Sequence, residues 1–169
     1  MIHEGIPKIT DFGAGKQKGV RTNHKNGIMG AICYLDPQRC GNQKFNEDYK
    51  LQKQSDIYSV GVIFWQISSG RKPFEDVKQN LGQKYKKEDK LYAQGLWDLF
   101  NEILNGKRET AVKDTPKKFV QLYEACWNSV PAIRPTISEV IETIEPILHN
   151  DMVEIILELM SRTLWIIMR

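Results

Sequence analysis

Residues 55–70 carry the stretch SDIYSVGVIFWQISSG, which decides the fold of this chain. A surface helix shows one apolar stripe, whereas this stretch is apolar on nearly every side, and a helix of that kind is buried on all its faces. A buried strand is the alternative, and the length of the run argues against it. We therefore expect a central buried helix, with the other segments packed around it in a mainly α-helical fold.

Residues at both ends of the stretch also favour a helix. Ser55 or Asp56 can cap the amino end, because a short side-chain oxygen accepts from the first free backbone N–H groups. Gly70 suits the left-handed conformation just past the last turn, and Pro73 prevents the helix from resuming. A helix over Asp56–Ser69 is about 21 Å long at ~1.5 Å per residue. It is too short for a membrane span, which needs roughly 20 apolar residues.

Beyond this helix the chain becomes polar before a helical pattern returns. The stretch 75–90 has no repeating apolar positions and is expected to be an exposed insert. The helical period returns at 91–104 and stops at Asn105-Gly106. The side chains predicted to face inward from this helix are Leu96, Leu99, Phe100, Ile103 and Leu104.

Two later helices are indicated by their start signals. Thr115-Pro116 offers a capping Thr followed by Pro in the first turn. Pro135 or Thr136 opens the second helix, and Pro146 is expected to kink or end it. The side chains predicted to face inward are Phe119, Val120, Leu122, Tyr123, Cys126, Trp127, Ile137, Val140, Ile141, Ile144, Ile147 and Leu148.

The amino-terminal part reads as short strands and loops. Two strands, 1–3 and 7–10, are expected to form a β-hairpin that turns at Glu4-Gly5. The stretch 14–28 is polar, rich in Gly and Lys and without periodicity, which is typical of a loop. An ordered segment, 30–38, follows it.

Composition limits the classes of function. The net charge of +3 and the scattered lysines do not favour nucleic-acid binding, and 41% apolar with 27% charged residues is ordinary for a globular domain. Three cysteines without a CxxC spacing favour a reducing compartment over a disulfide framework. The amino terminus has no apolar region typical of a secretory signal. Together these observations predict a cytoplasmic location.

The last segment, 149–169, differs from what precedes it. Its apolar residues Met152, Ile155, Ile156, Leu159 and Met160 form one stripe, and 164–168 is apolar without interruption. Its charged residues argue against a membrane span. An extra helix docked on the domain is the favoured interpretation. A partner-binding or membrane-surface helix, or a terminus that packs nowhere, are the alternatives.

Five motifs, in order along 1–148, resemble the carboxy-terminal lobe of eukaryotic protein kinases. The likeness is strongest to the tyrosine-kinase-like branch, including the expanded kinase sets of some fungi. The motifs are Asp11-Phe12-Gly13 for D-F-G, GAICYLDPQ at 30–38 for the end of the activation segment (G-T-x-x-Y-x-A-P-E), SDIYSVGV at 55–62 for S-D-V-Y-S-F-G-V, GRKPF at 70–74 for G-x-x-P-F, and Cys126-Trp127 with Arg134-Pro135 for C-W…R-P. The resemblance implies a partial protein kinase domain at 1–148, followed by the apolar tail.

The resemblance implies a site for ATP and Mg²⁺. Asp11 matches the aspartate that holds the Mg²⁺ bridging the ATP phosphates, because a hard cation prefers carboxylate oxygen. Phe12 matches the apolar residue whose packing sets the active or inactive state, and Gly13 allows the backbone to turn. Thr22 is the only hydroxyl between Gly13 and Tyr34, so it is the candidate phosphosite of the activation loop.

The resemblance also implies structural roles for three residues. Asp56 matches the aspartate that accepts N–H groups from the catalytic loop. Arg134 matches the arginine that pairs with the glutamate of A-P-E, and Gln38 stands in place of that glutamate. An amide lacks the charge, so a buried Arg134 is expected to be without a matching anion. Asp36 stands where the family has alanine, and Ala31 where Ser/Thr-specific kinases usually have threonine.

Other parts of the family pattern do not occur among these 169 residues. The glycine-rich loop, the strand lysine and the catalytic loop H-R-D-x-x-x-x-N would all precede D-F-G. Without them, Asp56 is expected to face solvent or substitute contacts, and this chain alone is expected not to transfer phosphate.

Three hypotheses follow from this pattern. The chain is part of an ATP-dependent kinase for protein Ser/Thr or Tyr, a non-catalytic pseudokinase-like binding module, or a non-functional remnant. Substitution at Gln38 and Ala31 leans towards the second. The expected partner is a protein substrate or a regulatory protein, and the oligomeric state stays open.

Overall fold

The computed structural model describes residues 2–3, 6–7, 32–41, 44–45 and 53–149 of the chain. This part is mainly helical. Its helices are α1 (Lys53–Ser69), α2 (Glu75–Lys84), α3 (Lys90–Leu104), α4 (Lys117–Cys126) and α5 (Ile137–His149), with short 3-10 turns η2 (Ile32–Tyr34), η3 (Pro37–Arg39) and η4 (Pro131–Ile133). The predicted mainly α-helical fold is therefore confirmed.

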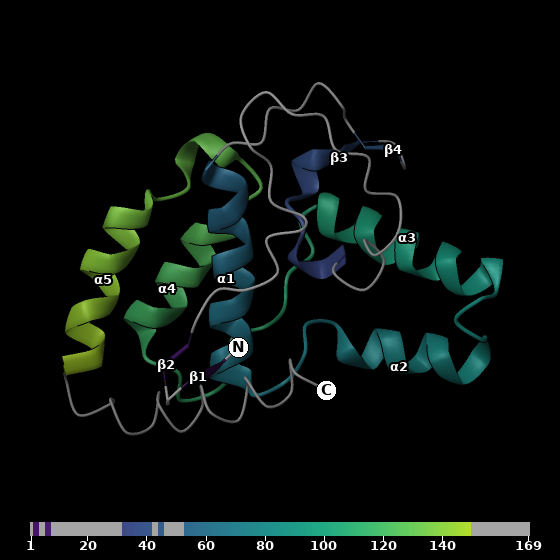
Figure 1. Cartoon of the computed structure of the whole chain (residues 1–169), viewed down its shortest axis with the longest axis horizontal. Helices are drawn as coiled ribbons and strands as arrows, with labels where there is room; N and C mark the ends of the chain where they lie inside the picture. The colour runs from purple at the N-terminus through teal and green to yellow at the C-terminus, as the bar shows by residue number, and fades with distance from the viewer. Residues whose placement is uncertain (1, 4–5, 8–31, 42–43, 46–52, 150–169) are drawn as a thin grey trace.

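Helix α1 is the centre of the arrangement (Figure 1). Helices α4 and α5 lie along one side of it, and α3 and α2 extend away on the other. The predicted helix is confirmed, but it begins at Lys53, three residues before the expected Asp56. Ser55 and Asp56 therefore lie within the first turn and are not its cap. Gly70 follows the helix with φ 63°, the left-handed conformation that was expected there.

The contact between α1 and α4 is unusually close at Gly61. A Cβ atom added to Gly61 would lie 2.8 Å from the Cβ of Cys126, 2.8 Å from the Trp127 nitrogen and 2.9 Å from the Tyr123 oxygen. Two of these atoms belong to the backbone, which cannot rotate away. Glycine is thus required for the two helices to pack at this distance.

Most of the predicted inward side chains form one core around α1. The largest fully buried side chains include Trp65, Tyr58, Tyr123 and Phe100. Trp65 also donates from Nε1 to the Thr110 carbonyl at 2.8 Å, so its polar atom is satisfied inside the core. The expectation that α1 is buried on every face is wrong, because Ile63 exposes 36% of its surface and Asp56 is exposed.

Helix α2 was not expected from the sequence. The prediction of an exposed insert is confirmed, since α2 contains no buried residue. An apolar repeat arises where one face of a helix is buried. Because α2 buries little of its surface, its sequence has no such repeat and the helix was not predicted. Glu75 and Asp76 in its first turn and Lys84 in its last complement the helix dipole, which favours a helix independently of burial.

Helix α3 begins at Lys90, one residue before the predicted start, and ends at Leu104 as predicted. Gly106 follows with φ 98°. Helix α4 begins at Lys117, one residue after the position expected for its first turn, with Pro116 before it.

Helix α5 differs from the predictions in two respects. It continues through Pro146 to His149, so of the two predicted effects of Pro146, a kink or an end, the end does not occur. Ile137 and Ile141, predicted to face inward, expose 52% and 47% of their surface, whereas Val140 and Ile147 are buried. The start signal is confirmed. Thr136 donates its backbone N–H to the Glu139 carboxylate at 2.7 Å, and Glu139 donates its backbone N–H to the Thr136 hydroxyl at 3.3 Å, a reciprocal capping box.

Two short antiparallel strand pairs complete the described part. Strand β1 (Ile2–His3) pairs with β2 (Ile6–Pro7), and β3 (Cys40–Gly41) pairs with β4 (Lys44–Phe45). Among the described helices, none is both long and apolar enough to cross a bilayer. The tail 150–169, expected to add a docked helix, lies outside the described residues.

Candidate functional site

The residues matched to the nucleotide site cannot be placed. Asp11, Phe12, Gly13 and the candidate phosphosite Thr22 lie outside the described residues, as does Ala31. Their assignments stay predictions. The described part of the site is the end of the segment 32–39 and the helices that hold it.

The most deeply buried charges of this part are Asp36 and Arg134. Their side chains are both 0% exposed. The guanidinium meets the carboxylate in a two-pronged arrangement, with Arg134 Nη1 donating to Asp36 Oδ2 at 2.7 Å and Nη2 donating to Oδ1 at 2.9 Å. A planar guanidinium matches a carboxylate in this way, whereas a lysine offers only a point charge. The pair joins the segment before β3 to the turn before α5.

Other groups complete the shell of the Asp36 carboxylate. The Ser55 hydroxyl donates to Oδ2 at 3.0 Å, and the Gln38 backbone N–H donates to Oδ1 at 3.1 Å. Each carboxylate oxygen therefore accepts at least two hydrogen bonds. A buried ion pair is stable only when hydrogen bonds of this kind replace the lost hydration.

Two further N–H groups of Arg134 bind backbone carbonyls. Nε donates to the Asn128 carbonyl and Nη1 to the Gln54 carbonyl, both at 2.8 Å. Arg134 thereby connects the loop after α4, at Asn128, to the first turn of α1, at Gln54. One side chain holds three stretches of chain that are far apart in sequence.

This geometry corrects the expectation for Arg134. The sequence pattern pointed to Gln38 as its partner and to an arginine without a matching anion. Gln38 is exposed, and its side-chain nitrogen donates to the Ser129 carbonyl at 3.3 Å. Asp36, two residues earlier, supplies the negative charge instead. The sequence contains a signal for this pairing, because Asp36 is an acidic residue at a position where the family has alanine.

Tyr58 lies beside this ion pair. The Cζ atoms of Arg134 and Arg108 lie 5.2 Å and 5.3 Å from the centre of its ring, close enough for cation–π attraction to both. Burial is the largest cause that raises the pKa of Tyr58, to about 12, while the Arg108 charge acts in the opposite sense. Tyr58 is therefore a neutral ring close to two guanidinium groups at physiological pH.

Arg108 secures the same region through backbone carbonyls. It donates from Nη1 to the Ile103 carbonyl at 2.7 Å and from Nε to the Trp127 carbonyl at 3.1 Å, and from Nη2 to the Ser129 hydroxyl at 3.1 Å. It thus links the end of α3 to the loop after α4. This role could not be predicted from the sequence, because an arginine that binds backbone carbonyls has no characteristic spacing to its partners.

A second connection holds η2 to α1. The Tyr34 hydroxyl donates to Gln66 Oε1 at 2.6 Å, and the Ser59 hydroxyl donates to the Tyr34 carbonyl at 2.8 Å. Gln66 is 0% exposed. Two contacts from positions about two turns apart on α1 therefore fix the orientation of Tyr34. Burial raises the pKa of Tyr34 to about 12.

Asp56 is exposed on the first turn of α1. The described residues give it no role in holding the segment around Asp36. Its expected partners would come from a catalytic loop, whose motif does not occur in this sequence.

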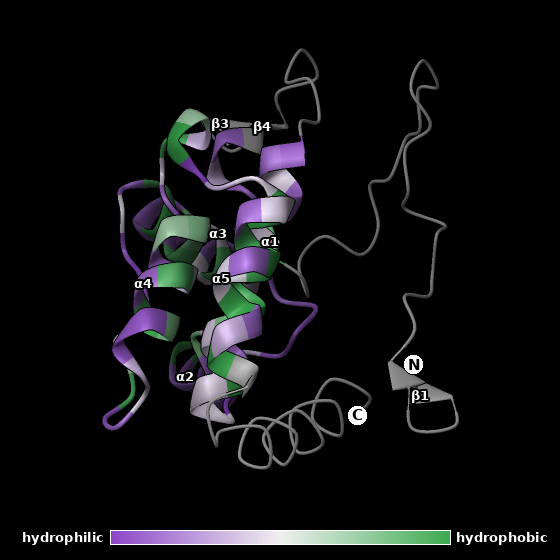
Figure 2. Cartoon of the chain, turned by 90° about the vertical axis from the view of Figure 1, so that its left-hand side faces the viewer, coloured by the Kyte–Doolittle hydropathy of each residue, from purple (hydrophilic) through white to green (hydrophobic). Residues whose placement is uncertain are grey.

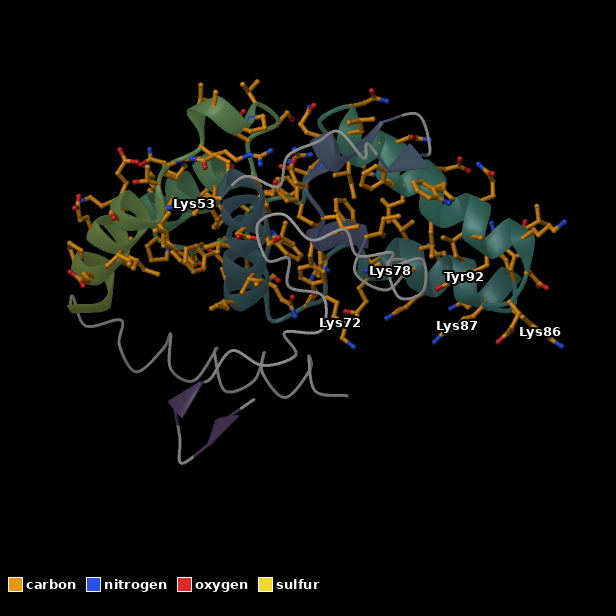
Figure 3. All side chains as sticks on the ribbon, turned by 45° about the horizontal axis from the view of Figure 1, so that its top comes forward. Lys53, Lys72, Lys78, Lys86, Lys87 and Tyr92 are labelled. Atoms are coloured by element: carbon orange, nitrogen blue, oxygen red, sulfur yellow. The ribbon has the colours of Figure 1, made fainter. Side chains whose placement is uncertain are left out.

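Several lysines lie on or near α2. Figure 3 shows Lys72, Lys78, Lys86 and Lys87 following one edge of the molecule. Acidic residues lie close to them in the sequence, with Glu75 and Asp76 before Lys78 and with Glu88 and Asp89 after Lys87. Asp89 also accepts the backbone N–H of Lys86 at 2.9 Å. This interspersed charge is typical of a solvated surface.

Comparison with known proteins covers most of the chain. Residues 1–144 match the family described as protein kinase domain. A probable LIM domain-containing serine/threonine-protein kinase of Dictyostelium discoideum is 24% identical over 140 residues, covering 83% of this chain and 12% of the relative. Receptor-interacting serine/threonine-protein kinase 4 of Mus musculus is 27% identical over 142 residues, covering 79% and 16%.

A further relative extends the match into the tail. A probable serine/threonine-protein kinase of Dictyostelium discoideum is 28% identical over 165 residues, covering 94% of this chain and 17% of the relative. The chain thus spans less than a fifth of the length of each of these relatives.

Proposed function

Because this chain belongs to the protein kinase domain family, we propose that residues 1–148 form the carboxy-terminal lobe of a serine/threonine protein kinase. The order of the described helices around a buried central helix agrees with such a lobe. The relatives described above are serine/threonine-protein kinases by name, which supports Ser/Thr, rather than Tyr, as the acceptor residue.

The single observation that carries the proposal is the buried pair of Asp36 and Arg134. In the family, a carboxylate at the end of the activation segment pairs with the arginine of the late helices. Here the negative charge lies two residues earlier, at Asp36, and hydrogen bonds from Ser55 and from the Gln38 backbone support the pair. A retained anchor of this kind supports the assignment of 30–38 to the segment that meets a protein substrate.

The reaction proposed for the whole kinase is phosphoryl transfer from ATP to a protein hydroxyl. When bound, Mg-ATP supplies the phosphoryl group, and Mg²⁺ neutralises charge on the phosphates. Asp11 is the residue of this chain proposed to hold the metal. Phe12 and Gly13 are proposed to position it, and Asp36 with Arg134 to hold the substrate-facing segment against α1.

A polypeptide of residues 1–169 alone is proposed not to transfer phosphate. The reaction needs a carboxylate base to orient the substrate hydroxyl and a lysine at the phosphates, and no motif that supplies either occurs in this sequence. The alternative, a pseudokinase-like binding module, loses one of its two arguments. The substitution at Gln38 no longer removes the charge opposite Arg134, and only the substitution at Ala31 still supports it.

The proposal is tested by reading the coding sequence upstream of Met1 and by assaying the longer product. We expect an in-frame H-R-D-x-x-x-x-N shortly before Met1. The longer protein should phosphorylate Ser or Thr of a generic protein substrate and lose this activity in Asp11→Asn. Asp98→Asn, on the exposed side of α3, is the matched control. An active Asp11→Asn protein would contradict the role of Asp11.

Nucleotide binding is tested separately on residues 1–169. A ligand that binds only the folded state raises the melting temperature. We expect no shift with Mg-ATP at sub-millimolar concentration, and a clear rise would refute the inactive interpretation.

Location, partners and regulation belong to the same proposal. A cytoplasmic kinase acting on a protein substrate or held by a regulatory protein fits the composition. Thr22 is proposed as a phosphosite. Mass spectrometry of the protein isolated from cells would detect the added phosphate, and its absence under all growth conditions would contradict this role.

A further inference from the structure

Helix α5 has an apolar arc that is only half covered. Val140 and Ile147 are buried against the core, and Ile144 packs at its edge. Ile137 and Ile141 lie one helical turn apart, adjacent to this inner row, and they expose 52% and 47% of their surface. We call Ile137 and Ile141 the outer stripe.

The outer stripe is partly exposed to solvent in the described structure. Helix α5 is at the outer side of the bundle in Figure 1, and Figure 2 views it from that side, where hydrophobic segments alternate with hydrophilic ones along its ribbon. In the turn before α5, Ile133 and Val130 are also 64% and 51% exposed. Isolated exposed apolar residues are ordinary, but consecutive ones at helical spacing point to something that covers them.

We propose that the outer stripe is the docking site of this chain's own tail, residues 150–169, folded back along α5 as an antiparallel helix. The tail begins where α5 ends in the described structure, at His149. It contains its own apolar stripe, Met152, Ile155, Ile156, Leu159 and Met160. An apolar stripe on each of two consecutive helices is the pattern of a helical hairpin.

The lengths of the two segments agree with this arrangement. Two antiparallel helices rise equally, by ~1.5 Å per residue, so residues about equally far from the reversal lie opposite each other. A reversal just after His149 therefore brings Leu159 and Met160 opposite Ile141. It also brings Leu164, the first residue of the uninterrupted apolar run, opposite Ile137.

Other occupants are less well matched to the stripe. A second copy would have to bind from solution, whereas the tail is tethered beside its site at an effective concentration in the millimolar range. An anionic membrane surface would meet the exposed carboxylates Glu139, Glu142 and Glu145 of α5, which repel it. The tethered tail is the occupant that sequence and position favour.

Hydrogen–deuterium exchange of the full 169-residue chain tests the proposal. Amides of 152–160 should be protected in the unaltered chain and exchange roughly tenfold faster or more in Ile141→Glu. Leu91→Glu is the matched control, because Leu91 is an exposed apolar helix residue (59%) away from the stripe. It should leave the tail unchanged.

A reciprocal variant covers the case in which Ile141→Glu unfolds the domain. Leu159→Glu, in the tail, should speed exchange at the carboxy-terminal half of α5 and leave α3 protected. Tail amides that exchange at the rate of an unstructured peptide in the unaltered chain would overturn the proposal. So would tail protection that rises with protein concentration, which indicates docking between copies, or protection seen only with anionic vesicles.

Discussion

Removal of the Asp36 carboxylate gives a large and specific loss of stability. In Asp36→Asn the shape is nearly kept, but Arg134 remains as a buried cation with a 0% exposed side chain and no anion beside it. Breaking a buried ion pair by removing one partner costs about 3–5 kcal/mol. For a domain of this size, each kcal/mol lowers the melting temperature by ~2–4 °C, so we expect a decrease of roughly 6–20 °C.

Thermal and urea unfolding followed by circular dichroism measure this loss. Gln38→Ala is the control, because Gln38 lies two residues away, is exposed, and makes one side-chain hydrogen bond in the described structure. It should change stability by about 0.5 kcal/mol or less. In Asp36→Asn the midpoint of urea unfolding should fall, while the dependence of the unfolding free energy on urea concentration stays the same. A change in that dependence would indicate a change in the unfolded state.

The double variant Asp36→Ala with Gln38→Glu asks whether the charge can return to the family position. If a glutamate at 38 can turn inward, it restores part of the stability lost in Asp36→Ala. A double-mutant cycle with Arg134→Met measures the interaction energy between Asp36 and Arg134. Since an unpaired buried charge is the costly species, the double variant Asp36→Asn with Arg134→Met should lose less than the sum of the single changes. Additive losses, or an Asp36→Asn protein as stable as Gln38→Ala, would refute the assignment of Asp36 as the anion.

Three further predictions follow from the described contacts. Gly61→Ala should destabilise the protein by about 1–3 kcal/mol in urea unfolding, since the added Cβ meets backbone atoms of α4. Gly82→Ala has open space around it and should stabilise α2 by roughly 0.5–1 kcal/mol. Equal effects of the two substitutions on stability would contradict the close approach of α1 and α4. Hydrogen bonds from the Thr136 backbone and hydroxyl lower the pKa of Glu139 below its ordinary 4.5. The cap of α5 therefore contributes stability above pH 4.5, and this stability is lost as the pH falls through the lowered pKa. Glu139→Gln should flatten the decline of the melting temperature at acidic pH, and an unchanged dependence of the melting temperature on pH would count against the cap. Burial raises the pKa of Cys126 to about 11 and the pKa of Cys33 above its ordinary 9.0. Neither thiol should therefore react with a disulfide reagent at about pH 8 until the protein unfolds. Rapid labelling of either cysteine in the folded protein would contradict their burial.

Local signals in the sequence determined the framework of helices. Helix α3 and the ends of α1 and α3 were predictable, because Gly70 and Gly106 act on the backbone of their own residues and the apolar period acts within one helix. The start of α5 was predictable for the same reason, since the cap that joins Thr136 and Glu139 spans only three residues. Arg134 was also identified in advance, through the motif around it. The motif of Asp11 is equally local, and its prediction awaits the experiments above.

Only the tertiary structure decided what depends on residues far apart. Asp36 and Arg134 are separated by 98 positions, and the choice between Asp36 and Gln38 as partner depends on how η3 turns against α1. Burial followed the same rule. Ile137 and Val140 are both apolar positions of one helix, but only the side that meets its neighbours is covered. Periodicity identifies which residues can be buried, and the placement of other elements decides which of them are.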